Sequence, residues 1–158
     1  MAQRGSNILR FLTITMTQGS ADAFIEGSAD TGIVPEDGVA LEIVRAELAF
    51  STALEAVSAD FDIIWTLSRD TKVAVAGYGD NDSLLYDGIS GSLTTSGQLL
   101  IPLRHNYPDM SGVYLVENTV YGQLDSNATG LTLTARWRLW YREVAVSEID
   151  ILRILNNS

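Results

Sequence analysis

The sequence predicts an all-β fold: an antiparallel β-sandwich, with a jelly roll as its leading version, followed by a short C-terminal helix. Apolar and polar residues alternate with a period of two in about eight segments of 5 to 12 residues, as expected for strands with one buried face. Short runs rich in Gly, Asn, Asp and Ser separate these segments. Clear three-residue apolar spacing, typical of a helix, appears at the end of the chain.

The composition suits one domain and excludes several kinds of site. The chain has 158 residues, and a domain of this length buries roughly 70% of its unfolded surface. It contains no Cys, which excludes disulfides, thiolate metal sites and cysteine nucleophiles. The net charge of −10 argues against nucleic acid as a main partner, because phosphate binding requires clustered Lys and Arg. With no run of 18 apolar residues, no membrane span is predicted, and the N-terminal segment lacks a signal peptide's apolar core.

The first part of the chain predicts an arm and two strands. Residues 1–8 are polar with little to bury, so we expect an N-terminal arm. Residues 9–17 alternate and are rich in β-branched side chains, which favours a first strand. Residues 21–26 are a second, shorter strand candidate, and residues 27–38 contain three glycines and a proline, which indicates a loop.

Residues 39–50 (VALEIVRAELAF) fit two kinds of element. Their Ala and Glu favour a helix, whereas their Val, Ile and Phe favour a strand. The alternation of Val39, Leu41 and Ile43 changes parity at Val44. One extra residue in a strand moves the following side chains to the other face. We therefore predict a strand with a bulge near Ile43 and Val44.

The middle of the chain predicts short strands between polar connections. Residues 61–68 (FDIIWTLS) give the clearest pattern, because Phe61, Ile63, Trp65 and Leu67 share one face. The remaining predicted strands are 72–76, 83–86, 92–95, 98–103 and 113–124, of which 92–95 and 98–103 form either a hairpin or one kinked strand. The predicted connections are 51–60 (a loop or short helix), 77–82 and 104–112.

Residues 129–146 (TGLTLTARWRLWYREVAV) form the longest alternating segment and predict a long strand. Trp137, Leu139 and Tyr141 lie on the face that we expect to enter the core. The opposite face is unusual in so acidic a chain, because it gathers arginines around a tryptophan. Its residues are Arg136, Arg138, Trp140 and Arg142.

The tail predicts a helix over residues 148–155. Ser147 and Asp150 fit a capping box, with Asp150 in the place usually taken by Glu. The apolar residues that follow recur every third position, so the helix must dock on its own domain or on a neighbour. These residues are Ile149, Leu152 and Leu155. The predicted organisation is an arm at 1–8, a β-sandwich at 9–146 and a helix with its tail at 147–158.

Few residues suggest chemistry, and we predict that the protein is not an enzyme. His105 is the only histidine and lies in a polar segment, where an exposed or interface role is expected. No Gly-x-Ser-x-Gly motif is present, because residues 88–91 fail its spacing. Asp80 and Asp82 are the best metal candidates, since calcium prefers closely spaced oxygen ligands, although the EF-hand pattern fails.

The arginine-rich face of the last strand admits several interpretations. Its cations could pair across strands with acids such as Glu117. They could also form a subunit interface, where Arg and Trp are enriched. The face could also contact nucleic acid, an acidic protein surface or a sugar stacked on Trp140.

This layout resembles the single jelly-roll capsid proteins of small icosahedral viruses. The resemblance covers residues 9 to about 146 and rests on the polar arm, the eight-strand pattern, the Gly-, Asp- and Asn-rich loops and the lack of a catalytic set. It carries no specific motif, so no functional residue is transferred. The arm departs from the basic arms of many capsid proteins, because it holds only Arg4 with Arg10 just beyond it. The terminal helix is also not a required part of that plan.

The leading hypothesis is a structural, self-assembling protein of a virion, either a capsid protein or another component. Its partners would be further copies of itself and other virion proteins, and its location the virion. We expect the contacts to come from the arginine-rich strand face and the helix. The residues are Arg136, Arg138, Trp140, Arg142, Ile149, Leu152 and Leu155.

The alternative hypothesis is a carbohydrate-binding or adhesive β-sandwich module. It would use exposed aromatic side chains and calcium at the acidic loop. The residues would be Tyr78, Tyr86, Tyr107 or Trp140, with Asp80 and Asp82.

Overall fold

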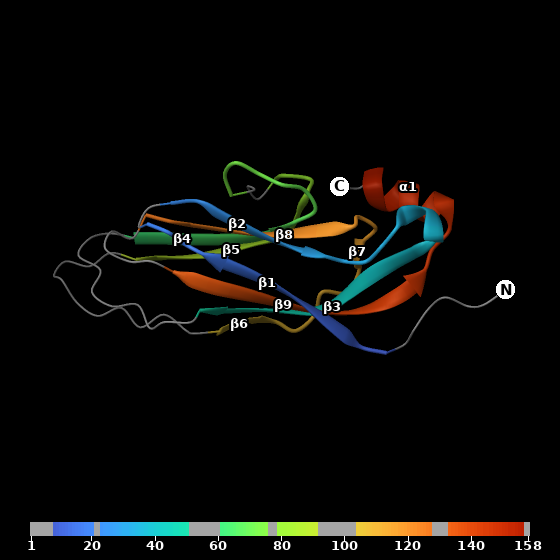
Figure 1. Cartoon of the computed structure of the whole chain (residues 1–158), viewed down its shortest axis with the longest axis horizontal. Coiled ribbons are helices and arrows are strands. Elements are labelled where there is room, and N and C mark those ends of the chain that lie inside the picture. The colour runs from blue at the N-terminus through green and yellow to red at the C-terminus, as the bar shows by residue number, and fades with distance from the viewer. Residues whose placement is uncertain are drawn as a thin grey trace.

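The computed structural model describes residues 8–20, 23–50, 61–75, 79–91, 104–127 and 133–156, which form a β-sandwich with one α-helix at its end (Figure 1). The larger sheet holds β1 (Arg10–Thr17), β9 (Thr134–Ala145), β3 (Val39–Phe50) and β6 (Arg104–Tyr107) in this order, and β7 (Val113–Leu115) also pairs with β3. The smaller sheet holds β2 (Ile25–Asp30), β8 (Thr119–Ser126), β4 (Phe61–Ser68) and β5 (Ser83–Gly91). The helices are the 3-10 helix η1 (Pro35–Asp37) and α1 (Glu148–Asn156).

The strand order is that of a jelly roll. With the short β7 set aside, the strands pair from the outside of the sequence inward, as β1 with β9, β2 with β8, β3 with β6 and β4 with β5. Every pair is antiparallel, and successive pairs alternate between the two sheets. A long hairpin wound around a core produces this order. The predicted all-β jelly roll with a C-terminal helix is therefore confirmed.

The core lies between the two sheets and is built from the inward faces of the strands. Trp137 and Leu139 of β9 and Trp65 of β4 are fully buried, as the alternation predicted. Tyr141, expected in the same row, is only partly buried. The other large, fully buried side chains are Ile14, Met16, Leu41, Ile43, Leu48, Ile63, Leu67, Leu115, Leu124 and Leu133.

The bulge predicted in β3 is confirmed. The pairing of β3 with β9 shifts register between Ile43 and Arg45, and the skipped residue is Val44. Both Ile43 and Ala46 are buried despite their opposite parity, because the extra residue reverses the faces of the strand. A helix at these residues is thereby excluded.

The second strand lies further along the chain than predicted. β2 begins at Ile25 and continues to Asp30, so the first residues of the predicted loop 27–38 are extended. Within this strand, Gly27 lies against β1, where a Cβ atom would overlap the Thr15 carbonyl oxygen. Its partner on β8 is another glycine, Gly122, which leaves room for the Trp137 indole.

Four other boundaries predicted from the sequence are wrong. β5 extends through Gly91 rather than ending at residue 86, and residues 104–107 form edge strand β6 rather than a loop. The predicted strand 113–124 is divided into β7 and β8, because Thr31 bonds the backbone carbonyls of Glu117 and Asn118 between them. The described part of 72–76 forms no strand, because Glu26 accepts a hydrogen bond from the Lys72 amide.

Several predicted segments lie wholly or partly outside the described residues. They are the arm at 1–8 except for its last residue, the beginning of strand 21–26, the connection 51–60, the end of strand 72–76, the beginning of the connection 77–82, the strands 92–95 and 98–103, the beginning of the strand 129–146, and the last two residues of the tail. The division into arm, sandwich and tail therefore stays a prediction. In the part of the chain that is described, no helix is long and apolar enough to cross a membrane.

A hydrogen-bonded chain ties the two sheets together at the edge formed by β5 and β6. The Trp65 indole donates to the Tyr107 hydroxyl at 2.8 Å, and that hydroxyl donates to Asp87 at 2.7 Å. Burial raises the pKa of Tyr107 well above its usual value. The Tyr107 hydroxyl thus stays neutral and satisfies the buried indole.

Replacing Tyr107 with phenylalanine should therefore destabilise the sandwich. The change leaves the Trp65 N–H without its acceptor, which typically costs about 1–3 kcal/mol. Urea unfolding followed by tryptophan fluorescence measures the loss. Tyr86→Phe is the matched control, because Tyr86 lies exposed on β5. Equal stability of the two variants would contradict this role for Tyr107.

Candidate interaction surfaces

The outer side of the larger sheet carries a cluster of arginines, which we call the arginine face. On β9, Arg136 and Arg138 are exposed, whereas Trp137 between them is buried. Arginines of two other strands join them through strand pairing. Arg45 of β3 lies opposite Trp140 of β9. Ala49 of β3 pairs with Arg136 on one side and with Arg104 of β6 on the other. The arginine face consists of Arg45, Arg104, Arg136, Arg138 and Arg142, with Trp140 and Phe11.

Trp140 is held between two arginines on this face. The Arg45 guanidinium carbon lies 3.7 Å from the indole centroid, and that of Arg138 lies 5.6 Å away. Arg138 also lies 5.3 Å from the ring of Phe11, which is the direct partner of Trp140 on β1. Cation–π contacts of this kind contribute about 0.5–1 kcal/mol at exposed sites. They hold the Arg45 and Arg138 side chains against the aromatic rings of this face.

Ion pairing on the arginine face is confined to Arg142. Its Nε lies 2.5 Å from Glu42 Oε2 on β3, and this hydrogen bond raises the pKa of Arg142. Glu117, the acid that was predicted to pair with these arginines, is not a partner of the arginine face. It lies between β7 and β8 and contacts Arg69 at 3.8 Å instead. Among the described residues, the other arginines of the face form no ion pair.

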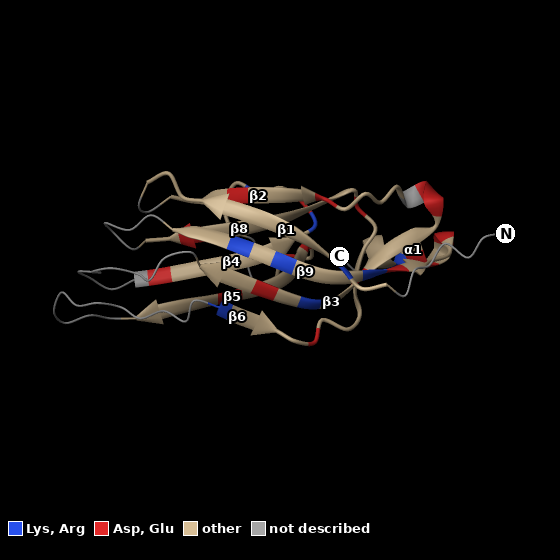
Figure 2. Ribbon diagram, turned by 60° about the horizontal axis from the view of Figure 1, so that its bottom comes forward, with Lys and Arg blue, Asp and Glu red and all other residues tan. Residues whose placement is uncertain are grey.

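Charge is divided between the two sheets. Within the described strands, those of the larger sheet hold six arginines and three glutamates. Those of the smaller sheet hold five acidic residues and neither Lys nor Arg. Figure 2 shows blue segments on β9, β3 and β6, with a red segment on β3 as well, whereas the strands of the smaller sheet carry red segments and no blue ones. The protein therefore has a cationic sheet inside a strongly acidic chain.

The terminal helix begins with the predicted capping box. The Asp150 amide donates to the Ser147 hydroxyl at 3.2 Å, and the Ser147 hydroxyl and amide donate to the Asp150 carboxylate at 2.6 and 3.2 Å. The hydrogen bonds from Ser147 lower the pKa of Asp150. This reciprocal bonding satisfies donors that the first helical turn leaves open, so α1 begins where the sequence predicted.

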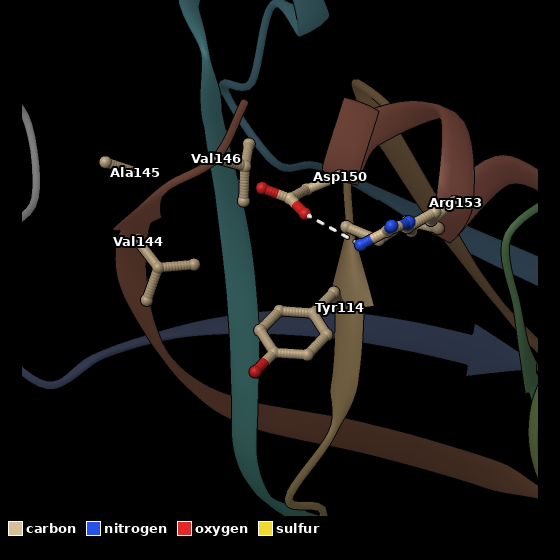
Figure 3. Close-up of a pocket in the computed structure, with 7 residues that line it drawn as sticks. Tyr114, Val144, Ala145, Val146, Asp150 and Arg153 are labelled. Carbon is tan, nitrogen blue, oxygen red and sulfur yellow. Dashed lines mark ion pairs between the residues drawn. The ribbon is translucent and has the colours of Figure 1, made fainter. Parts of the chain in front are cut away.

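The apolar side chains of α1 differ in their exposure. Ile151 and Ile154 are partly buried, and both line hollows between the helix and the end of the sandwich. One hollow, of about 340 Å³, lies between α1, Tyr114 of β7 and Val144 of β9 (Figure 3). The predicted contact residues are exposed, Ile149 by 63%, Leu152 by 58% and Leu155 by 44%, although Leu152 also lines the hollow beside η1.

The predicted calcium ligands already hold a cation of the protein. The Lys72 ammonium lies 2.7 Å from Asp82 Oδ2 and 3.3 Å from Asp80 Oδ2. Its hydrogen bond to Asp82 raises the pKa of Lys72, and the Asp82 amide lowers that of Asp80. Calcium would have to displace this ammonium, so the site stays a prediction. No group of three or more His, Asp or Glu residues in the described part could hold a metal.

The aromatic residues of the carbohydrate hypothesis are not brought together. Trp140 belongs to the outer side of the larger sheet, Tyr86 lies exposed on the smaller sheet, and Tyr107 is bonded between the sheets. Tyr78 lies outside the described residues. His105, predicted to be exposed or at an interface, is instead partly buried against Trp65, with ring centroids 4.5 Å apart.

Comparisons with known proteins give structural likeness without sequence relatives. No protein-family model and no curated protein matches the sequence. The Desmodium yellow mottle tymovirus structure is similar over 92% of this chain and 90% of its own, with 10% identity and a TM-score of 0.38. The VP2 subviral particle of infectious bursal disease virus covers 89% of this chain, with 15% identity and a TM-score of 0.33. The similarity covers only 33% of that VP2 chain.

Proposed function

We propose that this chain is a structural protein that self-associates, and that it serves in a virion as a capsid protein or another component of the particle. Its jelly-roll winding suits a rigid building block, because each sheet supports the other across a continuous core. Viral capsid proteins, lectins and cupins share this architecture, so the fold alone does not distinguish them. The exposed surfaces support the assembly role.

The observation that carries the proposal is the distribution of exposed apolar side chains. Most of the large ones in the described residues lie at the two ends of the chain, on α1 and at the beginning of β1. Exposed apolar side chains that recur in this way on a terminal helix are typical of a protein contact. The residues are Ile8, Leu9 and Phe11 near β1, with Ile149, Leu152 and Leu155 on α1.

Both surfaces lie toward the same end of the sandwich. Arg10 at the beginning of β1 bonds Glu143 near the end of β9 at 2.6 Å, and α1 follows β9 directly. Figure 1 shows both in the right-hand half of the molecule, with α1 at the top and the beginning of β1 at the bottom. In a symmetric assembly, one copy would therefore offer its helix stripe close to the apolar beginning of β1. The arginine face would supply a second contact.

Replacing Ile149, Leu152 and Leu155 together with glutamine should strongly reduce self-association. The exposed positions can accept a polar group, so the melting temperature should change little. Size-exclusion chromatography with light scattering, over a range of protein concentrations, measures the apparent molar mass. Val73→Gln is the control, because Val73 is an apolar side chain on the segment after β4 that is even more exposed, at 98%.

The proposal predicts that the helix variant shifts to a lower mass while the Val73 variant assembles like the unmodified protein. Two results would contradict this role of the helix. One is an unchanged molar mass in the triple variant, and the other is an equal loss of self-association in the Val73→Gln variant. A melting-temperature measurement on each variant separates lost contacts from lost folding.

A further inference from the structure

Among the four edge strands that the structure describes, β1 alone lacks the features that keep sheet edges from pairing. β2 carries Glu26 and Asp30, β5 carries Asp87, and β6 has only four residues. Charged side chains and short length both prevent one sheet edge from joining another. β1 has eight residues with no acid, lysine or proline, and its one charged residue, Arg10, is already bonded to Glu143. A second strand can therefore join this edge.

The backbone groups that β1 directs toward its edge belong to its odd-numbered residues. The Gln18 amide donates to the Leu133 carbonyl just before β9 at 2.8 Å, so the backbone of Gln18 faces β9. In antiparallel strands the backbone groups of successive residues point to opposite sides. Those of the odd-numbered residues therefore point away from β9. The Thr15 carbonyl agrees with this, because it lies against Gly27 of β2.

The part of this edge from Leu9 to Thr13, which we call the open edge, has no neighbouring strand. Figure 1 shows the beginning of β1 at the lower right, away from β2, whereas the Thr15 carbonyl further along β1 is covered by Gly27. Leu9, Phe11 and Thr13 are all exposed. Within the described residues, β1 pairs only with β9, so the outward backbone groups of the open edge have no backbone partner.

We propose that the open edge of one copy pairs antiparallel with the open edge of a second copy, with the two Phe11 residues opposite each other on a two-fold axis. This inference rests on the proposed self-association and names one of its contacts. Phe11 would exchange both backbone hydrogen bonds with its equivalent, and Leu9 would do so with Thr13. The two larger sheets would become one continuous sheet, and the contact is isologous because the same segment serves both copies.

The residues of the open edge favour this register over its two neighbours. An axis through Arg10 would set two guanidinium groups opposite each other, which is destabilising. An axis through Leu12 would set Leu9 opposite Thr15, whose carbonyl is already covered by β2. An axis through Phe11 avoids both and sets two aromatic rings opposite each other, an arrangement that stabilises paired strands.

The charges around the open edge allow two copies to approach. The chain has a formal net charge of −10, so two copies repel each other over most approaches. β1 holds no acid, and its neighbour β9 places Arg138 beside Thr13. The Arg138 residues of the two copies would stay at least three strand spacings apart, about 14 Å, which exceeds the screening length of about 8 Å at physiological salt. The strand pair is a small contact and would act together with that of α1.

Disulfide trapping tests the contact and its register, because the chain contains no Cys. Phe11→Cys places two thiols on residues whose Cα atoms would be about 5.5 Å apart, within the reach of a disulfide. Leu9→Cys is the matched control, since Leu9 is exposed by 57% and Phe11 by 59%, and both lie on the same side of β1. The Leu9 residues of the two copies would lie about 14 Å apart along the strands.

Oxidation with copper phenanthroline, followed by non-reducing electrophoresis, measures the rate of crosslinking. Phe11→Cys should form the disulfide-linked dimer at least about tenfold faster than Leu9→Cys, because only its thiols lie within reach of each other. Circular dichroism of the reduced variants checks that each is folded, as expected for exposed positions.

A mixture of two variants gives an independent check that keeps Phe11 in place. Leu9 of one copy faces Thr13 of the other in the proposed register. An equal mixture of Leu9→Cys and Thr13→Cys should therefore form the mixed dimer in preference to either dimer of one variant. Mass spectrometry of the crosslinked product identifies which chains are joined.

The outcomes separate this inference from the proposed function. Fast crosslinking of Phe11→Cys together with the mixed dimer supports the pairing. Equal rates for Phe11→Cys and Leu9→Cys would overturn it, because they indicate random collision or another register. Absence of both products, in a protein that still self-associates, also overturns the pairing and leaves the proposed function intact. An unmodified protein that stays monomeric throughout removes the proposed function itself, and the pairing with it.

Discussion

Replacing Trp137 with alanine is expected to lower the free energy of unfolding by about 3–5 kcal/mol. The indole is fully buried at the centre of β9 and lies 5.8 Å from the Tyr107 ring, measured between centroids. It also fills the space that Gly122 leaves on the opposite sheet, where a Cβ atom would lie 2.6 Å from its Cδ1. Because two rigid sheets form this space, little collapse can offset the cavity.

Trp140→Ala is the matched control, since both tryptophans belong to β9 and differ in the face that they occupy. Trp140 lies on the outer face and is only partly buried, so its removal should cost clearly less. Urea unfolding followed by far-ultraviolet circular dichroism compares the two. Equal losses would mean that the assigned inward and outward faces of β9 are wrong.

Gly27→Ala is expected to destabilise the fold by about 1–3 kcal/mol or more, which is the second large effect. The added methyl would overlap the Thr15 carbonyl oxygen and lie 3.1 Å from the Ile14 Cγ2 atom. Thr15 belongs to β1, which is paired along its whole length with β9, so the backbone cannot easily withdraw. The clash therefore forces β1 and β2 apart at the position where the two sheets approach closely.

The control for this substitution is Gly79→Ala. Nothing lies within 4 Å of a Cβ atom built at Gly79, so alanine should be tolerated there. Thermal unfolding of both variants measures the difference. A Gly27 variant as stable as the Gly79 variant would show that β1 and β2 are not held at the distance seen in the structure.

The alternation of apolar and polar residues predicted those strands that bury one face and expose the other. The parity change at Ile43 and Val44 revealed a bulge, because the inward positions of β3 must reach the core on both sides of it. β6 was missed for the opposite reason. It lies at the edge of its sheet and has the polar sequence RHNY, which gives no apolar alternation. It is a strand because it pairs with β3.

The arginine face could be predicted only in part. Arg136, Arg138 and Arg142 share one strand, so their common face follows from the period alone. Arg45 and Arg104 join them through the pairing of distant strands, and no local signal reports that register. The bulge beside Arg45 was the one available clue, because it decides which face that side chain occupies.

The sequence predicted where the terminal helix begins, but not how exposed each of its apolar residues is. Its beginning and its apolar spacing followed from the sequence, and the capping box at Ser147 and Asp150 is formed. The exposure of each apolar residue did not follow, since Ile151 and Ile154 are partly buried whereas Ile149, Leu152 and Leu155 are exposed. The outward stripe stays a predicted contact, and so do the residues of the arginine face.

The central claim is that this chain forms assemblies of itself. The most direct test is the molar mass of the unmodified protein, measured by light scattering across a wide concentration range and at low and high salt, with negative-stain microscopy of the same samples. We predict a mass that rises with concentration above that of the 17.2 kDa chain, together with regular particles or stacks. A constant mass near 17.2 kDa under every condition would contradict the claim.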